Sequence, residues 1–117
     1  MIRAVVEGPD GHSTLIVVTY DEFGGQWDHV PPPPYNRPAP FNRHRHLAPH
    51  DQWGPGTRVP ALLVSKRFHK SGVDHADHDT TSILKLIEER FNLKPLGTRD
   101  ANVISLRTAL DEGGLHD

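Results

Sequence analysis

An irregular stretch in the middle of the chain constrains its fold more than any other feature. Residues 30–57 show no sustained helical or strand pattern, and they include the proline run Pro31–Pro34, which favours an extended polyproline conformation. A structureless connection of this length inside a compact domain is expected to be functional or to cover something. It divides the 117-residue chain, so that any core must be built from one short region on each side of it.

Each of these two regions contains one run that is typical of a buried strand. Residues 13–20 are rich in β-branched and apolar side chains, and residues 58–65 form a second such run, with Pro60 near its start, where proline is tolerated. Because neither run alternates between apolar and polar residues, we expect both faces of both strands to be buried, as in the centre of an α/β sheet. Two strands cannot hide their own edges, so we expect them to need partners that this chain does not contain.

The remaining periodic segments predict helices, which makes the chain a single α/β unit over residues 1–117. A helix over residues 80–91 is predicted from apolar residues at helical spacing (Ile83, Leu84, Ile87 and Phe91), with Asp79 to Ser82 as candidate caps. A last helix is predicted over residues 100–110, with Asp100 as its cap. Residues 2–7 are predicted to be the end of a helix, which glycine and proline stop at residues 8–11.

Composition excludes several classes of function. The formal net charge of −2 predicts no strong attraction to nucleic acid or to anionic membranes. The basic patch at residues 41–46, near Trp53, is too small to indicate nucleic-acid binding in a chain with a net negative charge. We therefore predict no nucleic-acid partner. The chain has no cysteine, which excludes disulfides, thiolate metal sites and a cysteine nucleophile. Its apolar runs are far shorter than the roughly 20 residues of a membrane span, so we predict no transmembrane segment.

Acidic residues follow directly on the first predicted strand. Asp21 and Glu22 lie at its carboxyl end, where ligands bind in open α/β sheets, and paired carboxylates offer hard oxygen ligands to a divalent cation. Gly24 and Gly25 let the backbone turn sharply beside them. These residues alone leave two interpretations open, a metal site or an ordinary acidic turn after a strand. His29, a few residues later, is able to return to the same place.

A second group of polar residues precedes the predicted helix over residues 80–91. His75 is a candidate proton donor to a leaving group, or a metal ligand. For Asp79 we favour a simple helix cap, and for His78 we favour a solvated loop residue. The hydroxyl groups at residues 80–82 are weak candidates for a nucleophile, because hydroxyls at the start of a helix usually cap it.

Several segments together resemble a known family. They resemble, in the same order, the C-terminal portion of bacterial phospholipase C and acid phosphatase proteins. The matching motifs are Asp-Glu after a strand, then Gly-Gly and Asp-His-Val-Pro, a Gly-x-Arg-Val-Pro strand, a Gly-x-x-His step, an Asp-Thr-Thr-Ser helix start and a Pro-Leu-x-x-Arg-Asp segment. These segments are residues 14–33, 56–65, 72–75, 79–88 and 95–100. This phosphoesterase family is part of the alkaline-phosphatase-like superfamily.

The resemblance implies a fold and a chemistry. The implied fold is a partial alkaline-phosphatase-like α/β/α sandwich, with two core strands, a long proline-rich loop and C-terminal helices. The implied activity is metal-dependent hydrolysis of a phosphoester or phospholipid substrate, in which a divalent metal ion activates a hydroxyl nucleophile. By the same resemblance, Asp21 and Glu22 are metal ligands and His75 is a candidate catalytic residue. His29 has either a site role or a structural one.

The departures from the family define the alternatives. Family members are several times longer, and the part that carries their nucleophile and further metal ligands has no counterpart here. Two residues also differ: His78 is present where tyrosine is usual, and Phe23 is present where a polar residue is frequent. We expect a truncated gene, a misplaced start or a split protein, and a chain that is not competent alone. The alternative function is a non-catalytic interaction module, or half of a split enzyme that binds a separately encoded N-terminal part or a second copy. Localisation is left open: family members are often exported from bacteria, but residues 1–7 contain no targeting signal.

Overall fold

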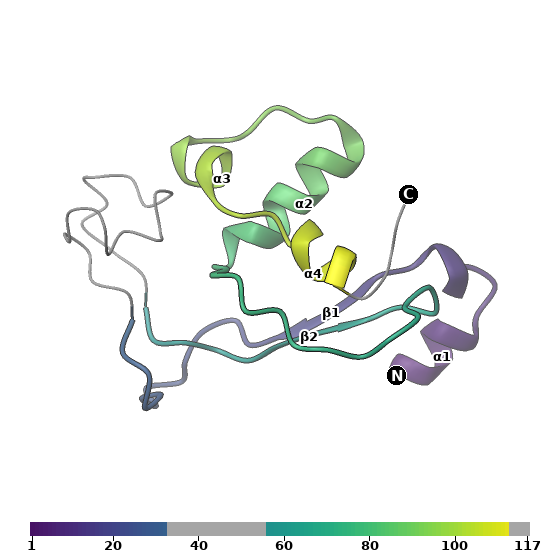
Figure 1. Ribbon diagram of the computed structural model, residues 1–117, viewed down its shortest axis with the longest axis horizontal. Coiled ribbons are helices and arrows are strands. Elements are labelled where there is room, and N and C mark those ends of the chain that lie inside the picture. The colour runs from purple at the N-terminus through teal and green to yellow at the C-terminus, as the bar shows by residue number, and fades with distance from the viewer. Residues whose placement is uncertain (33–55, 113–117) are drawn as a thin grey trace.

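The computed structural model describes residues 1–32 and 56–112. Their elements are α1 (Ile2–Glu7), a 3₁₀ turn (Gly11–Ser13), β1 (Ile16–Thr19), β2 (Ala61–Val64), α2 (Thr81–Phe91), α3 (Thr98–Asn102) and α4 (Arg107–Glu112) (Figure 1). This is a small α/β arrangement. Most of the predicted irregular stretch, together with the basic patch at residues 41–46, lies outside the described residues. Within them, no helix is long and apolar enough to cross a membrane.

The two strands form an antiparallel ribbon. Thr19, the last residue of β1, pairs with Ala61, the first residue of β2. Side chains extend the pairing beyond both ends of the ladder, since the Thr19 hydroxyl donates to the carbonyl of Pro60 at 2.8 Å and the Ser65 hydroxyl donates to the carbonyl of Thr14 at 3.1 Å. The ribbon therefore joins the regions on either side of the irregular stretch.

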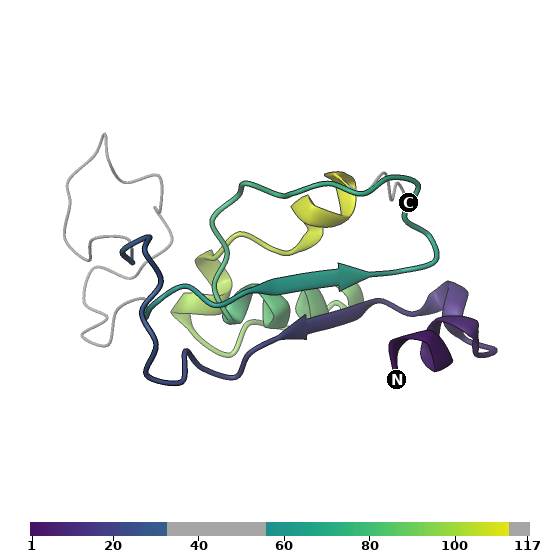
Figure 2. The same ribbon diagram turned by 90° about the horizontal axis from the view of Figure 1, so that it is seen from below.

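The faces of this ribbon are less buried than the sequence predicted. Val18 in β1 is 41% exposed and Leu62 in β2 is 55% exposed, so the expectation that both faces are buried is wrong for this chain. Seen from below, α2 lies behind the ribbon, and no described helix covers the side toward the viewer (Figure 2). Over residues 1–32 and 56–112 the ribbon has neither a third strand nor a second helical layer to enclose it, which leaves apolar side chains in contact with solvent.

Asp79, one residue before the N-cap Thr80, binds the first turn of α2. The carboxylate of Asp79 accepts hydrogen bonds from the backbone N–H of Thr81 at 2.7 Å and from the Thr81 hydroxyl at 2.6 Å. In return, the Asp79 N–H donates to the Ser82 hydroxyl at 3.0 Å. The helix ends at Asn92, whose φ of 52° is the left-handed conformation that commonly stops a helix.

The apolar stripe of α2 is not its buried face. Ile87 and Phe91 are exposed, whereas the buried residues of the helix are Ser82 and Glu88. Helix α2 contacts α3, and the chain after α3 reaches the first turn of α2 through a backbone hydrogen bond. This bond joins the Leu106 N–H to the Ser82 carbonyl at 3.5 Å.

The prediction of one helix over residues 100–110 is wrong, because the structure divides that region into α3 and α4. Val103 has an extended backbone (ψ of 161°) and ends α3, and α4 begins only at Arg107. Val103 and Leu106, in the connection between the two helices, are both buried. Asp100 is therefore not an N-cap but the third residue of α3, and its carboxylate accepts the N–H of Gly97.

Candidate functional site

The carboxylates of Asp21 and Glu22 lie in an exposed turn directly after β1. Asp21 Oδ1 accepts the N–H of Glu22 at 3.0 Å, and Glu22 Oε2 accepts the N–H of Gly24 at 2.8 Å. Gly24 and Gly25 have φ values of 63° and 74°, which residues with a Cβ adopt only under strain. The local backbone therefore orients both carboxylates and keeps their remaining oxygen lone pairs open to a ligand.

An ion pair connects this turn to Arg58, which precedes β2. Asp28 accepts hydrogen bonds from the N–H of Val30 at 2.7 Å and from Nη2 of Arg58 at 3.1 Å. The Val30 N–H, followed by the Arg58 guanidinium, holds the pKa of Asp28 below its ordinary value. His29 is exposed, and its Nδ1 is 3.5 Å from Asp28 Oδ1. The sequence-predicted residue His29 thus lies at the edge of an ion pair.

The second polar group is organised around Asp74 rather than His75. Asp74 Oδ2 is 2.9 Å from His78 Nε2 and accepts the Thr108 hydroxyl at 3.0 Å, while Asp74 Oδ1 accepts the Ala76 N–H at 2.8 Å. Partial burial opposes ionisation of Asp74, but the hydrogen bond with His78 and those from Ala76 and Thr108 outweigh it, so the pKa of Asp74 is lowered. The expectation that His78 is a solvated loop residue is wrong, because its ring is mostly buried between Asp74 and the carbonyl of Ile104.

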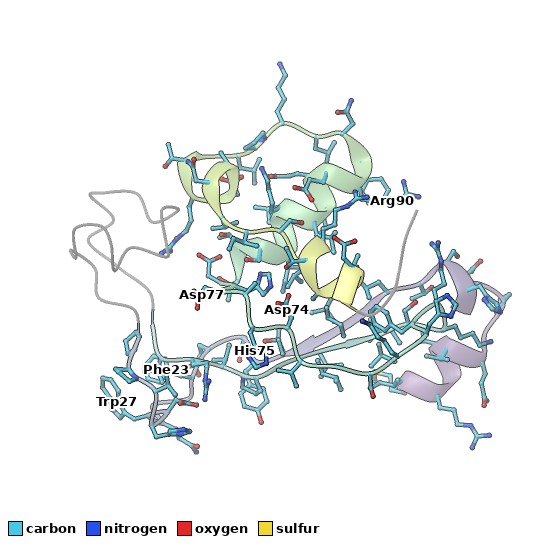
Figure 3. The ribbon with its side chains drawn as sticks, viewed as in Figure 1. Phe23, Trp27, Asp74, His75, Asp77 and Arg90 are labelled. Atoms are coloured by element: carbon cyan, nitrogen blue, oxygen red, sulfur yellow. The ribbon has the colours of Figure 1, made fainter. Side chains whose placement is uncertain are left out.

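His75 itself is exposed. Figure 3 shows it beside the ribbon, away from the turn that carries Phe23 and Trp27. Over the described residues, His75 does not join Asp21 and Glu22 in a group of three potential metal ligands. Among the predicted hydroxyl candidates, Ser82 is completely buried, which excludes it as a nucleophile.

The donor chemistry of Asp21 and Glu22 fits a divalent metal ion only in part. Carboxylate oxygens are ligands of the right kind for hard divalent cations. However, over residues 1–32 and 56–112 no three histidine or carboxylate side chains converge to hold a metal ion. The pair is thus suited to be part of a ligand set that the described residues do not complete.

Comparison with known proteins gives consistent results. A family model described as the phosphoesterase family matches residues 1–94. A non-hemolytic phospholipase C of Burkholderia pseudomallei is 35% identical over 94% of this chain and 17% of its own length. A non-specific phospholipase C6 of Arabidopsis thaliana is 32% identical over 85% of this chain and 21% of its own length. A phospholipase C B of Mycobacterium tuberculosis is 36% identical over 68% of this chain and 17% of its own length.

This chain therefore spans about a fifth of the length of the curated relatives that it matches. No solved structure matches it. The similarity includes both strands, the acidic turn after β1 and all of α2, since residues 1–94 contain each of them.

Proposed function

We propose, from the premise that this chain belongs to the phosphoesterase family, that it supplies part of the active site of a metal-dependent phosphoester hydrolase. The observation that carries the proposal is the pair Asp21 and Glu22, which the backbone after β1 orients toward solvent. The curated relatives support the class of reaction, because they are named as phospholipases C. The acid phosphatases of the same family make a phosphomonoester the second substrate class.

In this proposal the ribbon is one piece of a larger sheet. The partial alkaline-phosphatase-like α/β/α sandwich assigns β1 and β2 to its central layer, and α2 and α3 to one of the two helical layers. The exposed apolar side chains of the ribbon, among them Val18 and Leu62, support this assignment, since an inner strand of such a sheet is covered on both faces.

Each candidate residue then has a role that its position allows. Asp21 and Glu22 hold a divalent metal ion, and when bound, this ion offsets negative charge on the phosphoryl oxygens and lowers the pKa of a hydroxyl nucleophile. The N–H of Gly24 keeps Glu22 in place, and the Asp28–Arg58 pair closes the turn behind it. His29 borders the site beside Asp28. His75 donates a proton to the leaving group once the rest of the domain brings it to the substrate.

The isolated chain is expected to be inactive. Two carboxylates on a partial scaffold bind a metal ion weakly, and the described residues offer no third ligand to this pair. Hydrolysis of chromogenic phosphate monoesters and diesters, measured with a panel of divalent metals, checks this expectation. Activity that Asp21→Ala removes would contradict it, because it would mean that 117 residues assemble a complete site.

A chimaera tests the proposed role of the carboxylates directly. The aligned segment of the Burkholderia phospholipase C would be replaced by residues 1–94 of this chain. If the chimaera folds and hydrolyses its substrate, Asp21→Ala should reduce kcat/KM by at least about 100-fold, which is the scale of losing one preorganised electrostatic contact to the transition state. Glu89→Ala, which removes an exposed carboxylate from α2, is the matched control and should leave kcat/KM unchanged. A chimaera that is insensitive to Asp21→Ala would overturn the proposal.

The second candidate function is an interaction module without catalysis. It is favoured by the exposed apolar residues on both the ribbon and α2, such as Leu62 and Phe91, and by the outer strand edges of a two-stranded sheet. Its partner is a separately encoded N-terminal part of the domain or a second copy of the chain. Sedimentation over a range of concentrations separates these partners, since only self-association depends on the concentration of this chain alone. Leu62→Lys should weaken either association.

A further inference from the structure

Two carboxyl groups are buried against each other where α2 meets α3. Glu88 on α2 and Asp100 on α3 are each only 4% exposed, α2 contacts α3, and the nearby Asp100 carboxyl group is one of the causes that raise the pKa of Glu88. The proposed phosphoesterase chemistry uses neither of them. A hydrogen bond between two carboxyl groups requires a proton on one of the two, because two carboxylates have only acceptors.

The surrounding donors show which carboxyl group is ionised. Asp100 Oδ2 accepts the Leu96 N–H at 2.6 Å, and Asp100 Oδ1 accepts the Gly97 N–H at 2.9 Å. Backbone N–H groups can only donate, and hydrogen bonds of this kind favour the charged form of a carboxylate. Asp100 is therefore the ionised member of the pair.

Glu88 has the opposite environment. Neither of its side-chain oxygens accepts a hydrogen bond of good geometry from the described chain. The Leu96 N–H also faces Glu88, but it donates to Asp100, and the ammonium group of Lys85 donates to the carbonyl of Ala101 at 3.3 Å. Arg99, the cation on α3, lies against Asp79, with Nε 3.5 Å from Oδ2. A buried carboxylate without donors is unfavourable, whereas a protonated carboxyl group beside Asp100 has an acceptor.

We propose that Glu88 keeps its proton and donates it to the Asp100 carboxylate, so that a carboxylic acid–carboxylate hydrogen bond joins α2 to α3 and opens as the pH rises. Such a bond is a pH-sensitive lock built into the fold. Above the pH at which Glu88 loses its proton, both groups are acceptors only and the bond is absent; below the pH at which Asp100 gains a proton, the bond loses its charged acceptor and is weaker. The lock is closed between these two limits.

The direction of the pKa changes agrees with this geometry. Burial, followed by the hydrogen bond and the charge of Asp100, raises the pKa of Glu88 above its ordinary value of 4.5. Burial also opposes ionisation of Asp100, but the N–H of Leu96, the hydrogen bond from Glu88 and the N–H of Gly97 lower the pKa of Asp100 below its ordinary value of 3.8. The stability that Glu88 contributes through its raised pKa is complete below its pKa in the unfolded chain. It is lost as the pH rises through its pKa in the folded chain. Between them, the constant for opening α3 from α2 rises by up to about tenfold per pH unit.

Carbon-13 NMR of the side-chain carboxyl groups, combined with hydrogen exchange of the α3 amides, tests the lock in the full chain. The Glu88 carboxyl should titrate above its ordinary value of 4.5, and the protection factors of α3, corrected for the intrinsic exchange rate, should fall over the same pH range. In Glu88→Gln, where an amide donates to Asp100 at every pH, that fall should disappear. Glu89→Gln is the matched control and should retain it.

Two results would overturn the proposal. One is a Glu88 carboxyl that titrates at or below its ordinary value of 4.5 in the unmodified chain, a result that requires no variant to fold. The other is a pH-dependent loss of α3 protection that persists unchanged in Glu88→Gln.

Discussion

In the ribbon formed by β1 and β2, apolar side chains are exposed, whereas in the unit formed by α2 and α3, polar side chains are buried. Val18 and Leu62 contact solvent, while Ser82, Glu88 and Asp100 do not. In the helical unit, Ser82 and Asp100 find hydrogen-bond partners a short distance away along the chain, whereas the side-chain oxygens of Glu88 accept no hydrogen bond from the described residues. The apolar groups of the ribbon have too few neighbours within the described residues. We therefore expect contacts within the chain to stabilise the helical unit, whereas the ribbon needs another surface to bury its apolar side chains.

The comparison predicts that the two regions unfold separately when the isolated chain is heated. Near-ultraviolet circular dichroism reports on the tyrosines and tryptophans, all of which lie in or beside the segments that flank the ribbon strands (Tyr20, Trp27, Tyr35 and Trp53), and far-ultraviolet circular dichroism reports mainly on the helices. The near-ultraviolet signal should be lost first, over a broad range of temperature, because the ribbon buries little apolar surface. A single sharp transition that is seen equally by both probes, in a monomer, would remove the distinction between the regions.

Truncation of one leucine in each region sharpens the same contrast. Leu106 is 6% exposed and Leu62 is 55% exposed. Leu106→Ala should reduce the free energy of unfolding of the helical unit by about 2–4 kcal/mol, because it leaves a cavity as well as losing buried area. Leu62→Ala, the matched change in the ribbon, should cost less than about 1 kcal/mol. Urea unfolding followed by the helical signal measures both, and equal losses would contradict the account.

Removal of the Asp74 carboxylate should have an intermediate effect. Asp74→Ala loses the contacts with His78, Ala76 and Thr108, and should reduce the free energy of unfolding by about 1–2 kcal/mol at neutral pH. The pKa of Asp74 is lower in the folded chain than its ordinary value of 3.8. Its contribution to the free energy of unfolding is therefore complete above pH 3.8, and it is lost as the pH falls through the pKa of Asp74 in the folded chain. The difference between variant and unmodified chain should thus vanish in acid. Asp111→Ala, on the exposed surface of α4, is the control; a pH-independent difference for Asp74→Ala would refute the assignment.

The smallest effect is expected at the Asp28–Arg58 ion pair. Arg58→Gln should change the stability of the ribbon by an amount near the limit of detection, since exposed ion pairs are weak and are screened by salt. Raising the salt concentration of the unmodified chain should have a similarly small effect. A loss as large as that of Asp74→Ala would show that the turn after β1 stabilises the ribbon more than its exposure suggests.

Sequence patterns predicted the elements that are determined locally. The apolar runs around residues 16–19 and 61–64 and the spacing within residues 81–91 correspond to β1, β2 and α2. The break between α3 and α4 was not predicted from the spacing of apolar residues, and Val103 and Leu106, which lie in it, are buried. The buried polar face of α2 was missed as well, since helical spacing identifies an apolar stripe but not the surface that it will meet.

The candidate site was predictable to a similar extent. The position of Asp21 and Glu22 after a strand follows from adjacent residues, and the structure has them in the turn that follows β1. The contact between Asp74 and Thr108 joins residues 34 positions apart, and no spacing rule predicts it. The unusual residue at position 78 was a signal for this contact, because a histidine in place of the family's tyrosine is suited to pair with a nearby carboxylate.

The central claim is that the chemistry of this chain is located at the carboxyl end of β1. Titration of the isotope-labelled chain with Mn²⁺, followed by paramagnetic broadening of its amide NMR signals, tests that claim even if binding is weak. The account predicts that the signals of residues 20–25 broaden first, and that Asp21→Ala abolishes this broadening while Asp111→Ala does not. Broadening that is centred on Asp74 and His78, or on Glu88 and Asp100, and that persists in Asp21→Ala, would contradict it.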